Sequence, residues 1–110
     1  MDRLQRIRDL NDQLREFPIH PIGELVLTFG VMALPVLERF EVLRKVVEFD
    51  DFTSDNDPHG EHDFGAFEHG GERYFWKIDY YDCLKINHSP DPAEPAVTLR
   101  VLTVMRADEY

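Results

Sequence analysis

The residues whose types could do chemistry gather between positions 48 and 63. This segment holds seven Asp or Glu residues and two histidines, with no Lys or Arg. Within it, Asp55-Asn56-Asp57-Pro58-His59-Gly60 begins like an EF-hand calcium loop, with carboxylates at positions one and three and glycine at position six. The pattern then fails, because His59 occupies position five and Ala66 stands at position twelve, where a bidentate glutamate belongs. The spacing therefore disfavours calcium.

The same segment offers ligands for a transition metal, because Zn²⁺ and Mn²⁺ accept imidazole and carboxylate groups. A hydrolytic metal site would need converging carboxylates, such as Asp63 with Asp79 or Asp82. In a hairpin that turns at Gly70-Gly71, Asp63 and Asp79 point to opposite faces of the sheet. The sequence also has neither an HExxH nor a paired-cysteine spacing. A bound divalent metal is therefore an alternative hypothesis, with the candidate ligands Asp55, Asp57, His59, His62 and Asp63.

Other chemistry has little support in the sequence. The single cysteine, Cys83, could be a nucleophile with His62 or His88 as its base, but no triad spacing marks it. Lys77 and Asp79 lack the carboxylate that nuclease strands carry two residues before the lysine, because Phe75 stands there. A chain with one thiol makes no internal disulfide, so we expect a reducing, cytoplasmic compartment.

A purely structural interpretation explains part of the acidic segment. Asn56, Pro58 and Gly60 are residues that form turns and bond nearby backbone groups. This interpretation explains less well why seven acids crowd together without a base, since their mutual repulsion costs stability. An external cation or a basic partner would offset that cost.

The charge of the chain is unevenly distributed. The net charge is −10 over 110 residues, and the sequence sums to zero over residues 1–45, to −9 over 46–72 and to −1 over 73–110. Such a balance disfavours direct binding to nucleic acid and to anionic membranes, because both need cationic side chains. The most apolar stretch, 25–37, is interrupted by Gly30 and Pro35 and is too short to span a bilayer.

The length and the hydrophobic periodicity predict one α+β domain, residues 1–110, in the order α-β-α-β-β-α. We expect a small antiparallel sheet with helices packed on one face. The first helix is expected to end at Pro18 and Pro21. The last helix is rich in β-branched residues, so a strand over the same residues is an alternative. The expected elements are a helix over 3–17, a strand over 24–29, a helix over 35–49, a β-hairpin over 62–81 and a helix from 92–95 to about 107.

Two sets of apolar side chains are expected to face the core. Gly70-Gly71 is a favoured two-residue turn, and this register pairs Phe67 with Tyr74, Glu68 with Arg73 and Gly65 with Trp76. The hairpin then directs Phe67, Tyr74, Trp76, Ile78 and Tyr80 toward the core. The second helix presents an apolar stripe of Val36, Leu37, Phe40, Leu43, Val46 and Val47.

Three stretches of the chain resemble DUF3768, a bacterial family of unknown function. The first and longest runs from Phe49-Asp50-Asp51-Phe52 through Asp63-Phe64-Gly65. The second is Phe75-Trp76-Lys77-Ile78-Asp79-Tyr80-Tyr81-Asp82, and the third is the tail with Pro95-Ala96-Val97-Thr98 and residues 100–105. The resemblance implies a small accessory protein of the kind often met on plasmids and other mobile elements. It implies no particular activity, substrate or catalytic residue.

The leading hypothesis is a non-enzymatic protein that presents its acidic surface to a basic protein partner, with charge steering association. A nucleic-acid-binding protein is a natural target, so the protein would act as a DNA mimic or anti-defence factor, for example an anti-CRISPR inhibitor. A metal-binding or metal-dependent hydrolytic domain is the second hypothesis, and a structural subunit of a larger assembly is the third. The expected partner-binding residues are Asp50, Asp51, Asp55, Asp57, Glu61, Asp63, Asp79, Tyr81 and Asp82.

Overall fold

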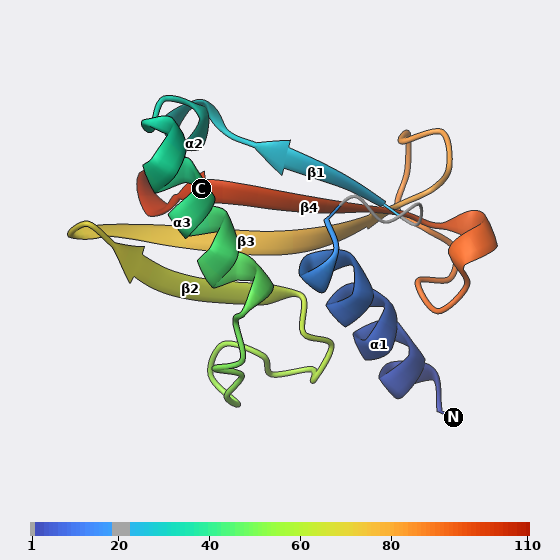
Figure 1. Cartoon of the computed structure of the whole chain (residues 1–110). Helices are drawn as coiled ribbons and strands as arrows, with labels where there is room; N and C mark the ends of the chain where they lie inside the picture. The colour runs from blue at the N-terminus through green and yellow to red at the C-terminus, as the bar shows by residue number, and fades with distance from the viewer. Residues whose placement is uncertain (1, 19–22) are drawn as a thin grey trace.

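The computed structural model of the chain describes residues 2–18 and 23–110, so Pro21 lies outside the described residues. The α+β class is confirmed (Figure 1). Helix α2 (Phe29–Met32) has no counterpart in the sequence expectations. The other elements are α1 (Arg3–Glu16), β1 (Gly23–Leu27), α3 (Val36–Val47), β2 (Phe64–His69), β3 (Glu72–Tyr81) and β4 (Leu99–Arg106), with short 3₁₀ helices at Pro95–Val97 and Ala107–Glu109.

The described strands form one sheet in the order β1-β4-β3-β2. Strands β2, β3 and β4 are antiparallel neighbours, as expected, but β1 pairs with β4 in parallel. The sheet is therefore mixed rather than purely antiparallel. The reason is topological, because two helices and the hairpin separate β1 from β4 and give the chain enough length to re-enter in the same direction.

The expected final helix is wrong, because residues 99–106 form strand β4 and only Pro95–Val97 is helical there. Strand β4 lies inside the sheet, and its side chains are buried on both faces. A strand covered on both faces shows no alternation of polar and apolar residues, so its periodicity resembles that of a helix. The β-branched residues were the signal that favoured the strand.

The hairpin forms with the expected register, which pairs Phe67 with Tyr74, Glu68 with Arg73 and Gly65 with Trp76. Gly70 and Gly71 adopt positive φ angles of 59° and 81°, the backbone conformation that a two-residue turn of this kind requires. The turn thus sets which side chains of β3 face the helices.

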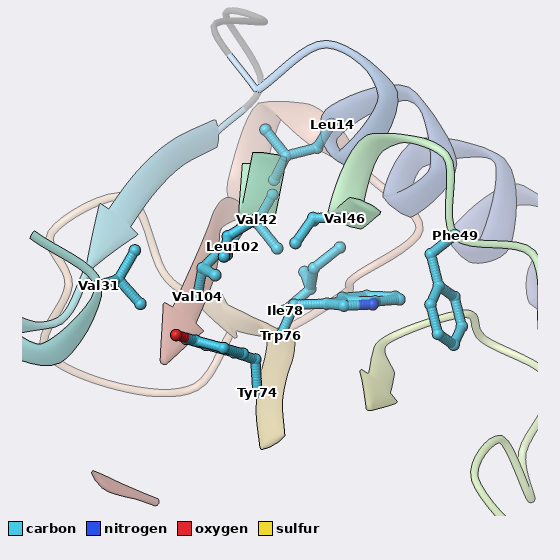
Figure 2. Packing of buried hydrophobic residues seen from close by; sticks show 10 residues of the cluster. All are labelled: Leu14, Val31, Val42, Val46, Phe49, Tyr74, Trp76, Ile78, Leu102 and Val104. Carbon is cyan, nitrogen blue, oxygen red and sulfur yellow. The ribbon is translucent and has the colours of Figure 1, made fainter. Parts of the chain in front are cut away.

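The core lies between the sheet and helices α1 and α3, on the face that carries Trp76 (Figure 2). Its buried members are Leu14 from α1, Val42 and Val46 from α3, Val31, Phe49, and Tyr74, Trp76, Ile78, Leu102 and Val104 from the sheet. Phe67 and Tyr80 pack against this cluster, so the expected core face of the hairpin is confirmed.

The expected apolar stripe of α3 is wrong over its first half. Val42 and Val46 are buried, whereas Val36, Leu37 and Phe40 are exposed to solvent. The helix therefore contacts the core through its second half.

Candidate functional site

The acidic segment is held in place by helix α1. The Arg8 Nε donates to the Gly60 carbonyl at 2.7 Å, and the Asn11 side-chain amide donates to the Glu61 carbonyl at 3.0 Å. Arg15, which is itself buried, donates to the carbonyls of Val46 and Val47 at the end of α3. Helix α1 therefore anchors the segment through donors to its backbone carbonyls, and Arg8 brings one positive charge close to it.

Turn chemistry fixes the middle of the segment. Thr53 N donates to the Asn56 side chain at 2.9 Å, and the Asn56 amide in turn donates to the Asp51 carbonyl at 2.8 Å. Gly60 has a positive φ of 69°, which suits glycine. The structural role expected for Asn56 and Gly60 is thus what the geometry shows.

His62 is enclosed by three side chains. Its ring stacks on Phe52 with the ring centroids 3.7 Å apart, and its Nδ1 lies 2.9 Å from the Asp12 Oδ1. Its Nε2 lies 3.7 Å from the carboxylate of Asp57, and the Asp57 Oδ1 also accepts a hydrogen bond from the His62 backbone N–H. His62 therefore joins the segment to α1.

The candidate metal ligands do not converge. Among residues 2–18 and 23–110, no three His, Cys, Asp or Glu side chains come together as a metal ion would need. Asp55 and His59 are exposed, while Asp57 and His62 contact each other as described above. The metal hypothesis stays a prediction without geometric support.

The expected partner-binding acids divide into two groups. Within the described residues, the carboxylates of Asp50, Asp51 and Asp55 are exposed and accept no hydrogen bond. In contrast, three other acids stabilise the fold: Asp57 binds the His62 N–H, Glu61 accepts from the Tyr80 hydroxyl at 2.6 Å, and Asp82 accepts from the N–H groups of Ile86 and Asn87.

A pocket of about 340 Å³ lies at the sheet edge, where β2 begins and β3 continues past it. Two backbone hydrogen bonds join β3 to the neighbouring segments here, since Ile78 N donates to the Asp63 carbonyl at 2.9 Å and Ser89 N donates to the Tyr80 carbonyl at 3.0 Å. The strand register turns Asp63 and Asp79 to opposite faces of the sheet. Both residues nevertheless line this pocket, because the pocket lies at the edge of the sheet rather than on one face. The pocket is lined by Asp63, Ile78, Asp79, Tyr80, Tyr81, Ile86, Asn87 and His88.

Asp63 is the electrostatically unusual group in this pocket. Burial raises the pKa of its carboxyl, and the neighbouring Glu61 carboxylate raises the same pKa further. Within the described residues no Lys, Arg or His forms an ion pair with Asp63, whereas Asp79 pairs with Lys77 at 2.9 Å. The structure of the folded chain therefore disfavours the ionised form of the Asp63 carboxyl.

We expect Asp63→Asn to raise the melting temperature at pH 7 by about 2–4 °C. A carboxyl whose pKa is higher in the folded state than in the unfolded state stabilises the fold most when protonated, and this contribution is lost as the pH rises through the folded-state pKa. The gain should therefore disappear below about pH 3.5, where the carboxyl is protonated in both states. Thermal melts between pH 3 and 8 measure it.

Asp55→Asn is the matched control, because Asp55 lies in the same segment but is exposed. It should leave the melting temperature nearly unchanged. A loss of stability in Asp63→Asn at pH 7 would contradict the electrostatic interpretation of the pocket.

A buried polar network supports the pocket from the core side. The Tyr80 hydroxyl accepts from the Asn11 amide at 2.7 Å, and the Arg100 guanidinium lies over the Tyr80 ring, 5.2 Å from its centroid. Arg100 is fully buried, and it also donates to the Asn11 Oδ1 at 2.9 Å and to the Pro92 carbonyl. Burial raises the pKa of the Tyr80 hydroxyl and lowers that of Arg100. The network fixes the end of β3 against α1.

Sequence reasoning missed Asn11 and Arg100 as site-supporting residues. Arg100 falls within the expected last helix, and nothing in its spacing marks it as buried. One signal was available, because Arg100 stands beside Val101 and Leu102 in a β-branched stretch that is compatible with an interior strand.

The lone thiol lies outside these arrangements. Cys83 is exposed and its Sγ donates to the Ala96 carbonyl at 3.4 Å. Of its two expected bases, His62 is engaged with Asp12 and Asp57, and the His88 ring packs edge-on against Tyr80. These contacts give the nucleophile hypothesis no support.

Fold and site together define a small α+β protein with an acidic pocket at the edge of a four-stranded sheet. The family model DUF3768, described as a protein of unknown function, matches residues 27–109, and the chain belongs to this family. Neither the curated proteins nor the solved structures contain a match. Within the described residues, no helix combines the length and the apolar character needed to cross a membrane.

Proposed function

We propose that this chain is a non-enzymatic protein that binds a partner protein through the acidic pocket at the end of β3. The pocket receives a Lys or Arg side chain of the partner. The exposed carboxylates of Asp50, Asp51 and Asp55 steer the encounter at longer range.

The observation that carries this proposal is the environment of Asp63. Its ionised carboxylate is unfavourable in the free protein, and a neutral side chain would cost less. A partner cation placed between Asp63 and Asp79 would remove that penalty, because opposite charges at close range favour the ionised form. Residues that reduce stability without a structural role commonly serve binding.

The other pocket residues suit the same ligand. Tyr81 and Tyr80 supply aromatic rings, on whose faces a guanidinium or ammonium group packs favourably. Asn87 and His88 supply polar groups to the lining of the pocket. The chemistry therefore fits a basic side chain with a long apolar stem.

The overall charge narrows the class of partner. A net charge of −10 with −9 in residues 46–72 favours a strongly basic surface, and nucleic-acid-binding proteins carry such surfaces where they contact phosphates. The proposed partner is therefore a nucleic-acid-binding protein whose phosphate-binding surface this chain covers. An anti-defence role is one form that such inhibition would take.

Capture from a bacterial lysate, followed by mass spectrometry, tests this proposal. Wild type is expected to retain one or more basic proteins, and the Asp63→Asn, Asp79→Asn variant is expected to lose them by about tenfold or more. Asp57 is left unchanged, because its carboxylate binds the His62 N–H and its removal would disturb the fold.

Glu72→Gln, Asp108→Asn is the charge-matched control. Both carboxylates are exposed and pair with Arg106, and Glu72 begins β3 at the end remote from the pocket. This variant should retain the same proteins as wild type. If the pocket variant and the control capture the same proteins as wild type, or wild type captures none, the proposal fails.

A further inference from the structure

An apolar patch covers α2 and the first half of α3. Five large side chains there are between about half and almost fully exposed: Phe29 86%, Met32 49%, Val36 54%, Leu37 75% and Phe40 62%. They follow helical spacing, so Phe29 and Met32 share one side of α2, and Val36 and Phe40 share one side of α3. Isolated apolar residues are ordinary at a surface, but five in one stretch mark an interaction site.

Side-chain hydrogen bonds anchor the two helices that carry the patch. The Arg39 guanidinium donates to the carbonyls of Met32 and Leu34, which joins α3 to the end of α2. The Glu109 carboxylate accepts from the Thr28 hydroxyl at 2.7 Å and from the Gly30 N–H at 2.8 Å. A surface fixed in this way loses little conformational freedom on binding.

The patch lacks the charge that would select a basic partner. The acidic side chains around it are already bonded within the chain: Glu38 to His69, Glu41 to Arg44 and Glu109 to the start of α2. The one cation between Val36 and Phe40 in the described α3, Arg39, is bonded to the carbonyls of Met32 and Leu34. Residues 1–45 also sum to zero charge. The surface that fits here is therefore apolar with a balanced polar margin, as this patch itself is.

Geometry keeps the acidic segments apart when two such patches meet. Helix α3 has 12 residues and is about 18 Å long, and the acidic segment begins only after its C-terminal end (Figure 1). A two-fold axis perpendicular to α3 and passing beside Val36 and Phe40 would run the two α3 helices antiparallel, so the two acidic segments would leave at opposite ends. Repulsion between two copies of net charge −10 is thereby limited.

The area also suits a dimer. Allowing about 200 Å² for a fully exposed large side chain, the five residues offer about 650 Å² of surface per copy. A standard interface buries about 800 Å² per partner including its polar margin. From these observations we infer that the chain forms a two-fold symmetric homodimer through the α2–α3 patch.

Sedimentation velocity over a range of concentrations, from about 1 to 200 µM, tests the dimer. Wild type should sediment as a dimer at the upper end, and a Leu37→Glu, Phe40→Glu variant should raise the dimer dissociation constant at least about 100-fold. Molar salt should not dissociate the wild-type dimer, because apolar contacts are not screened. Circular dichroism melts verify that the variant is folded, which is expected since both side chains are exposed.

Leu84→Glu is the matched control, because Leu84 is 77% exposed but lies in the turn after β3, outside the patch. It should dimerise like wild type. A wild type that stays monomeric at 200 µM would overturn the inference, and so would a Leu37→Glu, Phe40→Glu variant that dimerises normally. Neither outcome bears on the pocket at β3, because these substitutions lie outside it.

Discussion

Arg100→Ala should destabilise the protein by about 3–4 kcal/mol, the largest loss that we expect from a single side chain. The guanidinium is fully buried, and its removal leaves the Asn11 Oδ1 and the Pro92 carbonyl without their donor. A cavity beside the Tyr80 ring adds to the cost. Urea unfolding followed by circular dichroism measures the change.

Two further variants make this result interpretable. Arg100→Met keeps most of the volume and lacks the charge that burial disfavours, so it should cost clearly less than Arg100→Ala. Arg3→Ala removes an exposed arginine that pairs with Asp91, and this should cost less than about 1 kcal/mol. A loss below about 1 kcal/mol in Arg100→Ala would show that the network does not hold β4 to α1.

Gly65→Ala should destabilise the protein by about 3 kcal/mol, although it adds a single methyl group. A Cβ atom at Gly65 would lie 2.3 Å from the Trp76 Nε1 and 2.8 Å from the Phe49 Cζ. Trp76 is fully buried and Phe49 packs edge-on against its ring, so neither ring can move without displacing the core. We expect the melting temperature of the Gly65→Ala variant to fall by about 10 °C or more.

A double-mutant cycle with Trp76→Phe tests the cause. The smaller ring should leave space for the added methyl, so Gly65→Ala should cost less in the Trp76→Phe background than in wild type. Equal costs in the two backgrounds would mean that the glycine is needed for another reason. Ala66→Ser, at the next position of β2, should be nearly neutral by comparison, because its side chain points to the other face.

The sequence predicted those elements whose signals are local. The hairpin register followed from Gly70-Gly71, because that turn fixes which residues of the two strands face each other. Helix α1 followed from the spacing of its apolar residues, and its Ile7, Leu10 and Leu14 are buried. Of the two buried residues of α3, Val46 was within the predicted stripe and Val42 was not.

The remaining features depend on contacts between distant parts of the chain. Strand β4 was expected to be a helix because a strand buried on both faces has no two-residue alternation. The exposed half of α3 could not be separated from its buried half, because periodicity does not show where the core ends. One sign was available, since apolar residues occupy seven of the 12 positions of α3, more than one buried stripe needs.

The sequence predicted which residues gather in the candidate site but not how they are arranged in space. The acidic segment was evident from charge alone, but the sequence did not distinguish Asp57 and Glu61, which hold the loop, from the exposed Asp55. For Glu61 that distinction depends on Tyr80 of β3, and for Asp57 on how the segment folds back to the His62 N–H. The pocket likewise requires Asp63 and Asp79 to line one hollow at a sheet edge, which depends on where β2 begins.

The central claim is tested most directly by measuring how tightly the captured partner binds wild type and the Asp63→Asn, Asp79→Asn variant. Both affinities are measured at about 0.05 M and about 0.5 M salt. We expect the wild-type affinity to fall as salt rises, since ion pairs at a surface pocket are screened. The variant should bind at least about tenfold more weakly at low salt and show a smaller salt dependence. Equal affinities for the two proteins, or a wild-type affinity that salt does not change, would contradict binding through the acidic pocket.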